Sequence, residues 1–170
     1  MRRACLSILA VFLLSPFCFA ETRSQQDGLF RIDVPECWHW FERPGYVMIT
    51  NPERNNSISI QFIPMHIESD EKAKEILKEG NQAMTANTIR PFLKGNVISD
   101  IETDIDGVYA RKLDYLFPSA DEMEFGSETV HGTYLSLFHK DYTFAITFGA
   151  LQRSKERSKM EKILDSFRLQ

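Results

Sequence analysis

Hydrophobic and polar positions alternate most regularly between residues 129 and 151. Large apolar residues occupy every second position from 142 to 148, which is the spacing of a strand with one buried face. The preceding half of the segment carries apolar residues on both faces: Val130, Tyr134 and Phe138 on one, Leu135 and Leu137 on the other. The segment therefore predicts an antiparallel hairpin in a sheet that is covered on both sides.

Further segments have the composition of strands, and they are residues 28–34, 46–50, 57–65, 96–103 and 108–117. In the first of them Phe30, Ile32 and Val34 alternate with polar residues, and Pro35 ends the pattern. Asp106-Gly107 separates the last two segments. An Asp-Gly pair is typical of a tight hairpin turn because both residues tolerate a positive φ.

Two segments show helical spacing. Residues 70–86 follow the candidate N-caps Ser69 and Asp70 and end before Pro91. Residues 154–168 begin at Ser154 and place apolar residues at i, i+3, i+4 and i+7 from position 160. The predicted fold is α+β, a mostly antiparallel six- to seven-stranded sheet with one helix on each face, which makes an α/β/α sandwich.

The first twenty residues have the layout of a secretory signal peptide. Arg2 and Arg3 precede an apolar stretch, and Ala20 closes a segment with small residues before the expected cut. A membrane anchor is the weaker alternative, because the apolar stretch is shorter than the roughly 20 residues that a spanning helix needs. A lipoprotein acylated at Cys18 is also weaker, because Phe17 stands where a small residue is expected. Export to the periplasm or the exterior is therefore predicted.

After the signal peptide, the polar residues 21–27 are predicted to form a flexible tail, and residues 28–170 a single domain. Removal of residues 1–20 takes away two arginines and no acid, so 18 basic and 24 acidic residues remain, a formal net charge of −6. This charge argues against a nucleic-acid partner. Membrane contact is expected only through the cleaved signal peptide, and the acidic residues 121–124 are interpreted as a solvated loop.

An aromatic group lies on residues 35–41, which we interpret as a connection rather than a regular element. Trp38 directly follows the first strand and is predicted to close one end of the core. The pattern does not decide between core and surface for Trp40. Trp40, Phe41 and His39 are therefore the candidate binding surface.

Cleavage after Ala20 would leave Cys37 as the only cysteine, so no disulfide within one mature chain is expected. A small buried side chain is the favoured interpretation of Cys37. A reactive thiol or a bond between chains is the alternative.

No catalytic motif is present. The histidines His39, His66, His131 and His139 are scattered, and the last two are too far apart along one strand to share a metal ion. Neither a nucleophile elbow nor a phosphate-binding glycine loop occurs. No metal and no cofactor are therefore expected, although a catalytic site can assemble in space without a motif.

The two ends of the domain resemble the PsbP-like and DcrB-like α/β/α sandwich domains. The resemblance lies in Phe30-Arg31-Ile32-Asp33-Val34-Pro35 with Trp38 shortly after, and in Ile163-Leu164-Asp165-Ser166-Phe167 near the C-terminus. It covers roughly residues 28–169 and rests on core and turn positions, so it carries over no functional residue. It implies a binding or accessory module without catalysis.

The leading hypothesis is thus an exported, non-catalytic binding or accessory protein of the cell envelope or the extracellular space, with an unknown protein or small molecule as partner. One alternative is an envelope enzyme or metal-dependent protein that uses a spatial cluster of histidines and acids. The other is a secreted factor that acts on a host or neighbouring cell.

Overall fold

The structure, a computed structural model, describes residues 20–119, 129–151 and 154–170. Its main sheet is antiparallel and has seven strands in the order β3-β4-β5-β9-β8-β7-β6. These strands are β3 (His39–Arg43), β4 (Tyr46–Thr50), β5 (Ser57–Pro64), β6 (Asn96–Ile105), β7 (Val108–Pro118), β8 (Thr129–His139) and β9 (Tyr142–Leu151). The predicted signal peptide lies outside the described residues except for Ala20.

A second sheet contains the three strands β1 (Ala20–Ser24), β2 (Phe30–Pro35) and β10 (Arg168–Leu169), with β2 in the middle. Two helices complete the domain. α1 (Asp70–Met84) continues into the π-helical turn η1 (Thr85–Ile89), and α2 (Lys155–Asp165) precedes β10.

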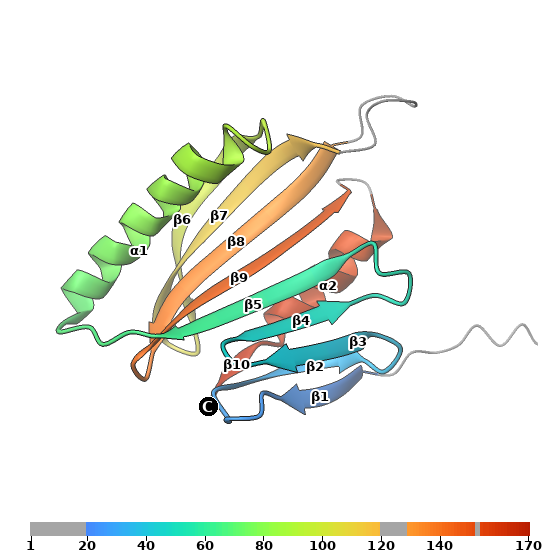
Figure 1. Cartoon of the computed structure of the whole chain (residues 1–170), viewed down its shortest axis with the longest axis horizontal. Coiled ribbons are helices and arrows are strands. Elements are labelled where there is room, and N and C mark those ends of the chain that lie inside the picture. Colours follow the sequence, from blue (N-terminus) through green and yellow to red (C-terminus); the bar gives the residue numbers. More distant parts are fainter. Residues whose placement is uncertain (1–19, 120–128, 152–153) are drawn as a thin grey trace, which may run out of the picture.

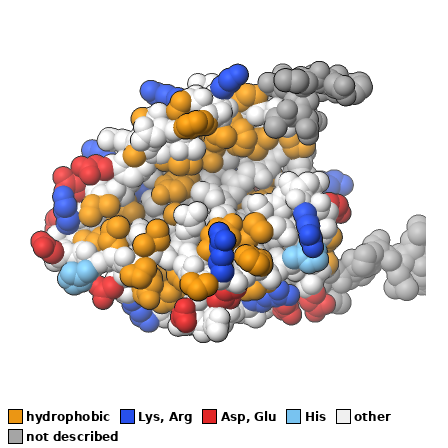
Figure 2. Space-filling model, in the orientation of Figure 1, with side chains coloured by type: hydrophobic (Ala, Val, Ile, Leu, Met, Phe, Trp, Pro, Cys, Tyr) orange, Lys and Arg blue, Asp and Glu red, His pale blue; other side chains and the backbone are white. Residues whose placement is uncertain are grey.

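The elements form three layers around the main sheet (Figure 1). α1 packs on β7 and β8 on one side, while α2 and β2 lie against the opposite side. The predicted fold class is therefore confirmed, including the placement of one helix on each face. Beyond α1 the sheet is uncovered on the α1 side, and Figure 2 shows a hollow there.

The local sequence explains where each helix begins. The Ser69 side chain accepts a hydrogen bond from the Lys72 backbone N–H, and Ser154 does the same for Glu156. Both serines satisfy an amide that the first helical turn leaves without a partner.

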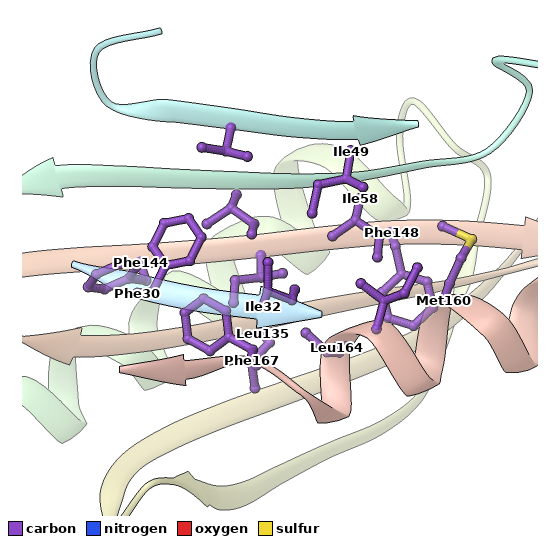
Figure 3. Close-up of a cluster of buried hydrophobic side chains, with 14 of the residues drawn as sticks. Phe30, Ile32, Ile49, Ile58, Leu135, Phe144, Phe148, Met160, Leu164 and Phe167 are labelled. Atoms are coloured by element: carbon purple, nitrogen blue, oxygen red, sulfur yellow. The ribbon is translucent and has the colours of Figure 1, made fainter. Parts of the chain in front are cut away.

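The main core fills the space between the seven-stranded sheet and the layer of α2 and β2 (Figure 3). Phe30 and Ile32 of β2 meet Phe144 and Ile146 of β9, and Phe167 follows α2; all five are fully buried. Burial of one such side chain stabilises the fold by roughly 1.5–3 kcal/mol.

A smaller cluster holds α1 and η1 on the other side of the sheet and consists of Ile89, Leu113 and Tyr115. Gly132 makes room for it, because a Cβ at this position would lie 2.4 Å from the Tyr115 ring. The Tyr115 ring therefore packs directly on the β8 backbone at Gly132.

The turns follow the backbone preferences of their residues. Asp106 and Gly107 have φ values of 52° and 79°, as predicted for the β6–β7 hairpin. Lys140 and Asp141 adopt similar values of 48° and 60° between β8 and β9.

Two expectations about the N-terminal region are wrong. Residues 21–24 of the expected tail form most of β1, which pairs with β2, and Thr22 donates a 2.6 Å hydrogen bond to Asp33. This strand is mostly exposed, so backbone pairing rather than an apolar face stabilises it, and its polar sequence gives no strand signal. The aromatic connection is in part strand β3, which forms a hairpin with β4 through Gly45 at a φ of 73°.

Candidate functional site

The side of the main sheet that carries α1 is only partly covered. α1 packs on β7 and β8, and no described element lies over β3, β4 and β5 on this side. We call the outward-facing residues of these three strands the open face: His39, Phe41, Arg43, Tyr46, Met48, Thr50, Ser57, Ser59, Gln61 and Ile63.

Strand register sets the layout of the open face. Phe41 pairs with Met48, and Met48 pairs with Ser59 on the next strand. Ser59 in turn pairs with Thr147 of β9, so small and hydroxyl-bearing side chains continue across the sheet. Phe41 is 52% exposed and Ile63 55%, although each stands on a regular strand. Exposed large apolar side chains, here Phe41 and Ile63, beside small side chains form a surface suited to binding another protein.

The charge of the open face has one sign. The Arg43 guanidinium carbon lies 4.8 Å from the centre of the Tyr46 ring, an arrangement that holds this cation by a cation–π contact. None of the ten residues of the open face is acidic. Glu42 belongs to the opposite side of β3, where it accepts hydrogen bonds from the Trp40 indole at 3.0 Å and from Gln25 at 3.0 Å. A partner with acidic groups would therefore meet no carboxylate of β3, β4 or β5 on this side of the sheet.

The three candidate residues of the aromatic segment do not form one surface. His39 and Phe41 share the open face because they are two positions apart on β3. Trp40 points to the other side and packs near Phe30, with ring centres 6.5 Å apart. Trp38 is 4% exposed, so its predicted place in the core is confirmed.

Three further residues of the open face were not predicted from the sequence: Arg43, Met48 and Ile63. A signal was present in the third predicted strand, where Ile63 follows Ser59 and Gln61 on the polar face. An apolar side chain at the end of a polar strand face is either exposed to solvent or covered by another part of the protein. The sequence does not distinguish these two cases.

Cys37 is exposed in the turn between β2 and β3, so the expectation of a buried side chain is wrong. Cys37 is disulfide-bonded in this structure, and its reactivity as a thiol in the mature chain stays a prediction. The other cysteines, Cys5 and Cys18, lie outside the described residues. Cleavage after Ala20 would remove both of them, so Cys37 of the mature chain could form a disulfide only with another chain.

The four histidines lie in different places. His39 is on β3, His66 follows β5, and His131 and His139 lie near opposite ends of β8. In the part of the chain that the structure describes, no three His, Cys, Asp or Glu side chains are arranged to hold a metal ion. His66 Nδ1 lies 2.9 Å from Asp141 Oδ1 in an exposed pair, which resembles a surface interaction rather than a reactive one.

A buried polar cluster surrounds Asp114 on the side of the sheet that faces α2. Thr133 donates a 2.6 Å hydrogen bond to Asp114 Oδ1, and Ser99 donates a 3.2 Å bond to Oδ2. Burial acts to raise the pKa of Asp114, but the Thr133 hydrogen bond and the charge of Lys112 hold it below its ordinary value. His131 Nε2 lies 3.4 Å from Asp114 Oδ1, yet the geometry gives it no hydrogen bond. The Thr133 and Ser99 hydroxyls therefore donate to the Asp114 carboxylate and not to the His131 imidazole. A nucleophile–base pair would need a hydroxyl that donates to the imidazole.

His131 is expected to make stability depend on pH. Burial and the charge of Arg157 lower the pKa of His131, and the Asp114 charge opposes this only in part. At pH values between the lowered pKa of His131 in the folded chain and its ordinary value of about 6.5, His131 binds a proton more readily in the unfolded chain than in the folded chain. The free energy of unfolding should therefore be highest above that range and decrease as the pH falls through it.

Urea denaturation of the parent and of His131→Gln between pH 5 and pH 8 measures this effect. The variant should lose most of the slope in that range, whereas the same change at the exposed His39 gives the matched control. An unchanged slope in His131→Gln would show that other groups set the pH dependence.

No family model matches the sequence, and no curated protein sequence matches it. Solved structures do match. The chain is similar to the solution structure of cyanobacterial PsbP (CyanoP) from Synechocystis sp. PCC 6803, with a TM-score of 0.64, 13% sequence identity and coverage of 99% of this chain and 98% of that chain.

LpqN of Mycobacterium tuberculosis, a protein involved in cell envelope biogenesis, matches with a TM-score of 0.56 and 11% identity over 89% of this chain and 90% of that one. A crystal structure from Bacteroides thetaiotaomicron VPI-5482 matches with the same TM-score of 0.56 and 11% identity, over 88% of this chain but only 48% of that one. The chain therefore has the PsbP-like fold that the sequence resemblance indicates, and these identities speak for the fold alone. No helix among the described residues is long and apolar enough to cross a membrane.

Proposed function

We propose that this protein is a non-catalytic binding or accessory protein of the cell envelope or the extracellular space, and that its open face binds a protein partner. The observation that carries the proposal is the open face, where Phe41 and Ile63 are exposed beside small side chains such as Ser59. The N-terminal signal-peptide pattern supports export. The fold it shares with LpqN, which is involved in cell envelope biogenesis, supports a place in the envelope.

The chemistry of the open face defines the partner. Four neighbouring strands from β3 to β9 span about 14 Å, which is enough for one helix about 10 Å wide. Phe41, Met48 and Ile63 would contact apolar side chains of that helix, and Arg43 would pair with a carboxylate at its margin. The partner is therefore expected to present an amphipathic helix with an acidic border.

The test compares Phe41→Glu with Phe92→Glu, because both phenylalanines are exposed but Phe92 lies outside the open face. Each mature variant is immobilised and used to capture proteins from its own envelope extract, and each captured partner is then purified and titrated. Phe41→Glu should weaken binding by at least about tenfold, which corresponds to ~1.4 kcal/mol, while Phe92→Glu should bind as the parent does.

Thermal unfolding of both variants controls for folding, and neither should change much because both positions are exposed. A partner that binds both glutamate variants equally would exclude the open face as its site. Mass analysis of the mature chain tests the export part of the proposal separately, since processing after Ala20 leaves Glu21 as the first residue.

A further inference from the structure

The free edge of β6 is a second surface without a described partner. β6 has ten residues and stands at the end of the main sheet, so one side of its backbone pairs with β7. No described strand pairs with its other side. An edge of this length offers backbone N–H and C=O groups to any extended chain that fits beside it.

Apolar side chains along this edge are exposed. Ile98 is 54% exposed and Ile101 49%, and Val97 beside them is 37% exposed. The β6–β7 register shifts between Val97 and Ser99, so Ile98 is an extra residue at a bulge. The regular part of the edge that remains for pairing runs from Ser99 to Ile105 and has Ile101 near its middle.

Acidic residues alternate with the apolar ones in this regular part. Asp100, Glu102 and Asp104 lie on the side of the sheet that carries α1. The Arg111 guanidinium neutralises Asp100 at 2.8 Å, but Glu102 lies 3.5 Å from the same guanidinium with its side chain 69% exposed. Glu102 and Asp104 therefore give the free edge a negative charge.

This charge selects among the possible occupants. A second copy of β6 in antiparallel pairing would set its acids directly opposite these acids, and like charges across a strand pair are destabilising. An extended segment with lysine or arginine at alternate positions would instead place cations opposite Glu102 and Asp104, and apolar residues opposite Ile101.

We propose that the edge of β6 binds an extended, basic and apolar segment of a partner protein, which adds to the sheet as an eighth strand. Main-chain hydrogen bonds hold such a strand, and the alternate side chains decide which sequence binds. The neighbouring cleft of 640 Å³ between α1 and the β6–β7 pair carries cations as well as acids, among them Lys72, Lys74 and Lys78 beside Glu71 and Glu102, so the acids that face the added strand are those of β6 and not the other acids of the cleft. This surface is separate from the open face, since β3 and β6 are opposite ends of the sheet.

Two capped ten-residue peptides test the proposal, one of alternating lysine and valine and one of alternating glutamate and valine. Each is titrated into the full mature chain while backbone amide shifts are recorded. The lysine peptide should bind at least about tenfold more tightly than the glutamate peptide, and the largest shifts should fall on residues 99–105.

Glu102→Lys combined with Asp104→Lys should reverse the preference of the two peptides. Glu36→Lys, an equal type of charge change in the β2–β3 turn, should leave it unchanged. Equal binding of both peptides, shifts centred on other strands, or an unreversed preference in the double variant would each overturn the proposal. Dimerisation of the parent chain through residues 99–105 would overturn it as well. A loss of open-face binding in Phe41→Glu has no bearing on these outcomes.

Discussion

Phe30→Ala is expected to lower the free energy of unfolding by about 3–5 kcal/mol. The Phe30 side chain is fully buried and lies at the meeting point of three parts of the fold. Its ring centre is 5.1 Å from that of Phe167 after α2, and 6.3 Å from that of Phe144 on β9. Alanine would leave a cavity that the small sheet, α2 and the main sheet could not all move to fill.

Guanidinium chloride denaturation measures this loss, since the transition midpoint shifts while its steepness stays nearly the same. A domain of this size has a total stability of about 5–15 kcal/mol, so the variant should unfold at much lower denaturant concentration. Phe92→Ala is the matched control because Phe92 is 79% exposed, and its effect should stay within about 0.5 kcal/mol. A loss below about 1 kcal/mol in Phe30→Ala would mean that the layer of β2 does not fold together with the main sheet.

Periodicity in the sequence was enough to predict the elements with one buried face. Phe144 and Ile146 alternate regularly on β9, and Met160, Ile163 and Leu164 form the apolar stripe of α2, with Phe167 just after its end. The Asp106-Gly107 turn is also a local signal, because the backbone conformation depends on those two residues. These features depend on near neighbours in the chain, so a single sequence contains them.

Pairing between distant strands was not predicted. Phe30, Ile32 and Val34 alternate like the residues of any half-buried strand, and nothing in that pattern shows that β2 belongs to a separate sheet with β1 and β10. β1 has polar residues on both faces and is stabilised by its partner strand. Local periodicity says which side of a strand is apolar, but not which strand lies beside it.

The candidate site was predictable only in part for a related reason. Phe41 and His39 stand out in the sequence, but Ile63 joins them only because β4 lies between β3 and β5. The open face also exists because α1 packs on β7 and β8 and stops short of β5. The sequence shows that α1 has an apolar stripe and does not show how much of the sheet it covers.

The position of α1 depends on a buried polar network, and Asp100→Ala is expected to lower the free energy of unfolding by about 2–4 kcal/mol. Asp100 Oδ1 accepts hydrogen bonds from Arg111 Nη2 at 2.8 Å and from Asn81 Nδ2 at 2.8 Å. Asn81 is fully buried and the Arg111 side chain is 10% exposed. The substitution would leave a buried amide and a buried cation without their acceptor. The expected loss is smaller than for a fully buried ion pair, because the Asp100 side chain is 30% exposed.

Glu102→Ala separates this network effect from simple charge removal. Glu102 is also an acid on β6 and also approaches Arg111, but at 3.5 Å and with its side chain 69% exposed, so its loss should cost less than about 1 kcal/mol. Asp100→Ala combined with Arg111→Leu should be more stable than Asp100→Ala alone, because the buried cation is then absent. Denaturant unfolding of the three variants and of Arg111→Leu completes the thermodynamic cycle. Equal losses for Asp100→Ala and Glu102→Ala would mean that Asn81 and Arg111 find other partners, and that packing of Leu77 and Ile89 alone fixes α1 to the sheet.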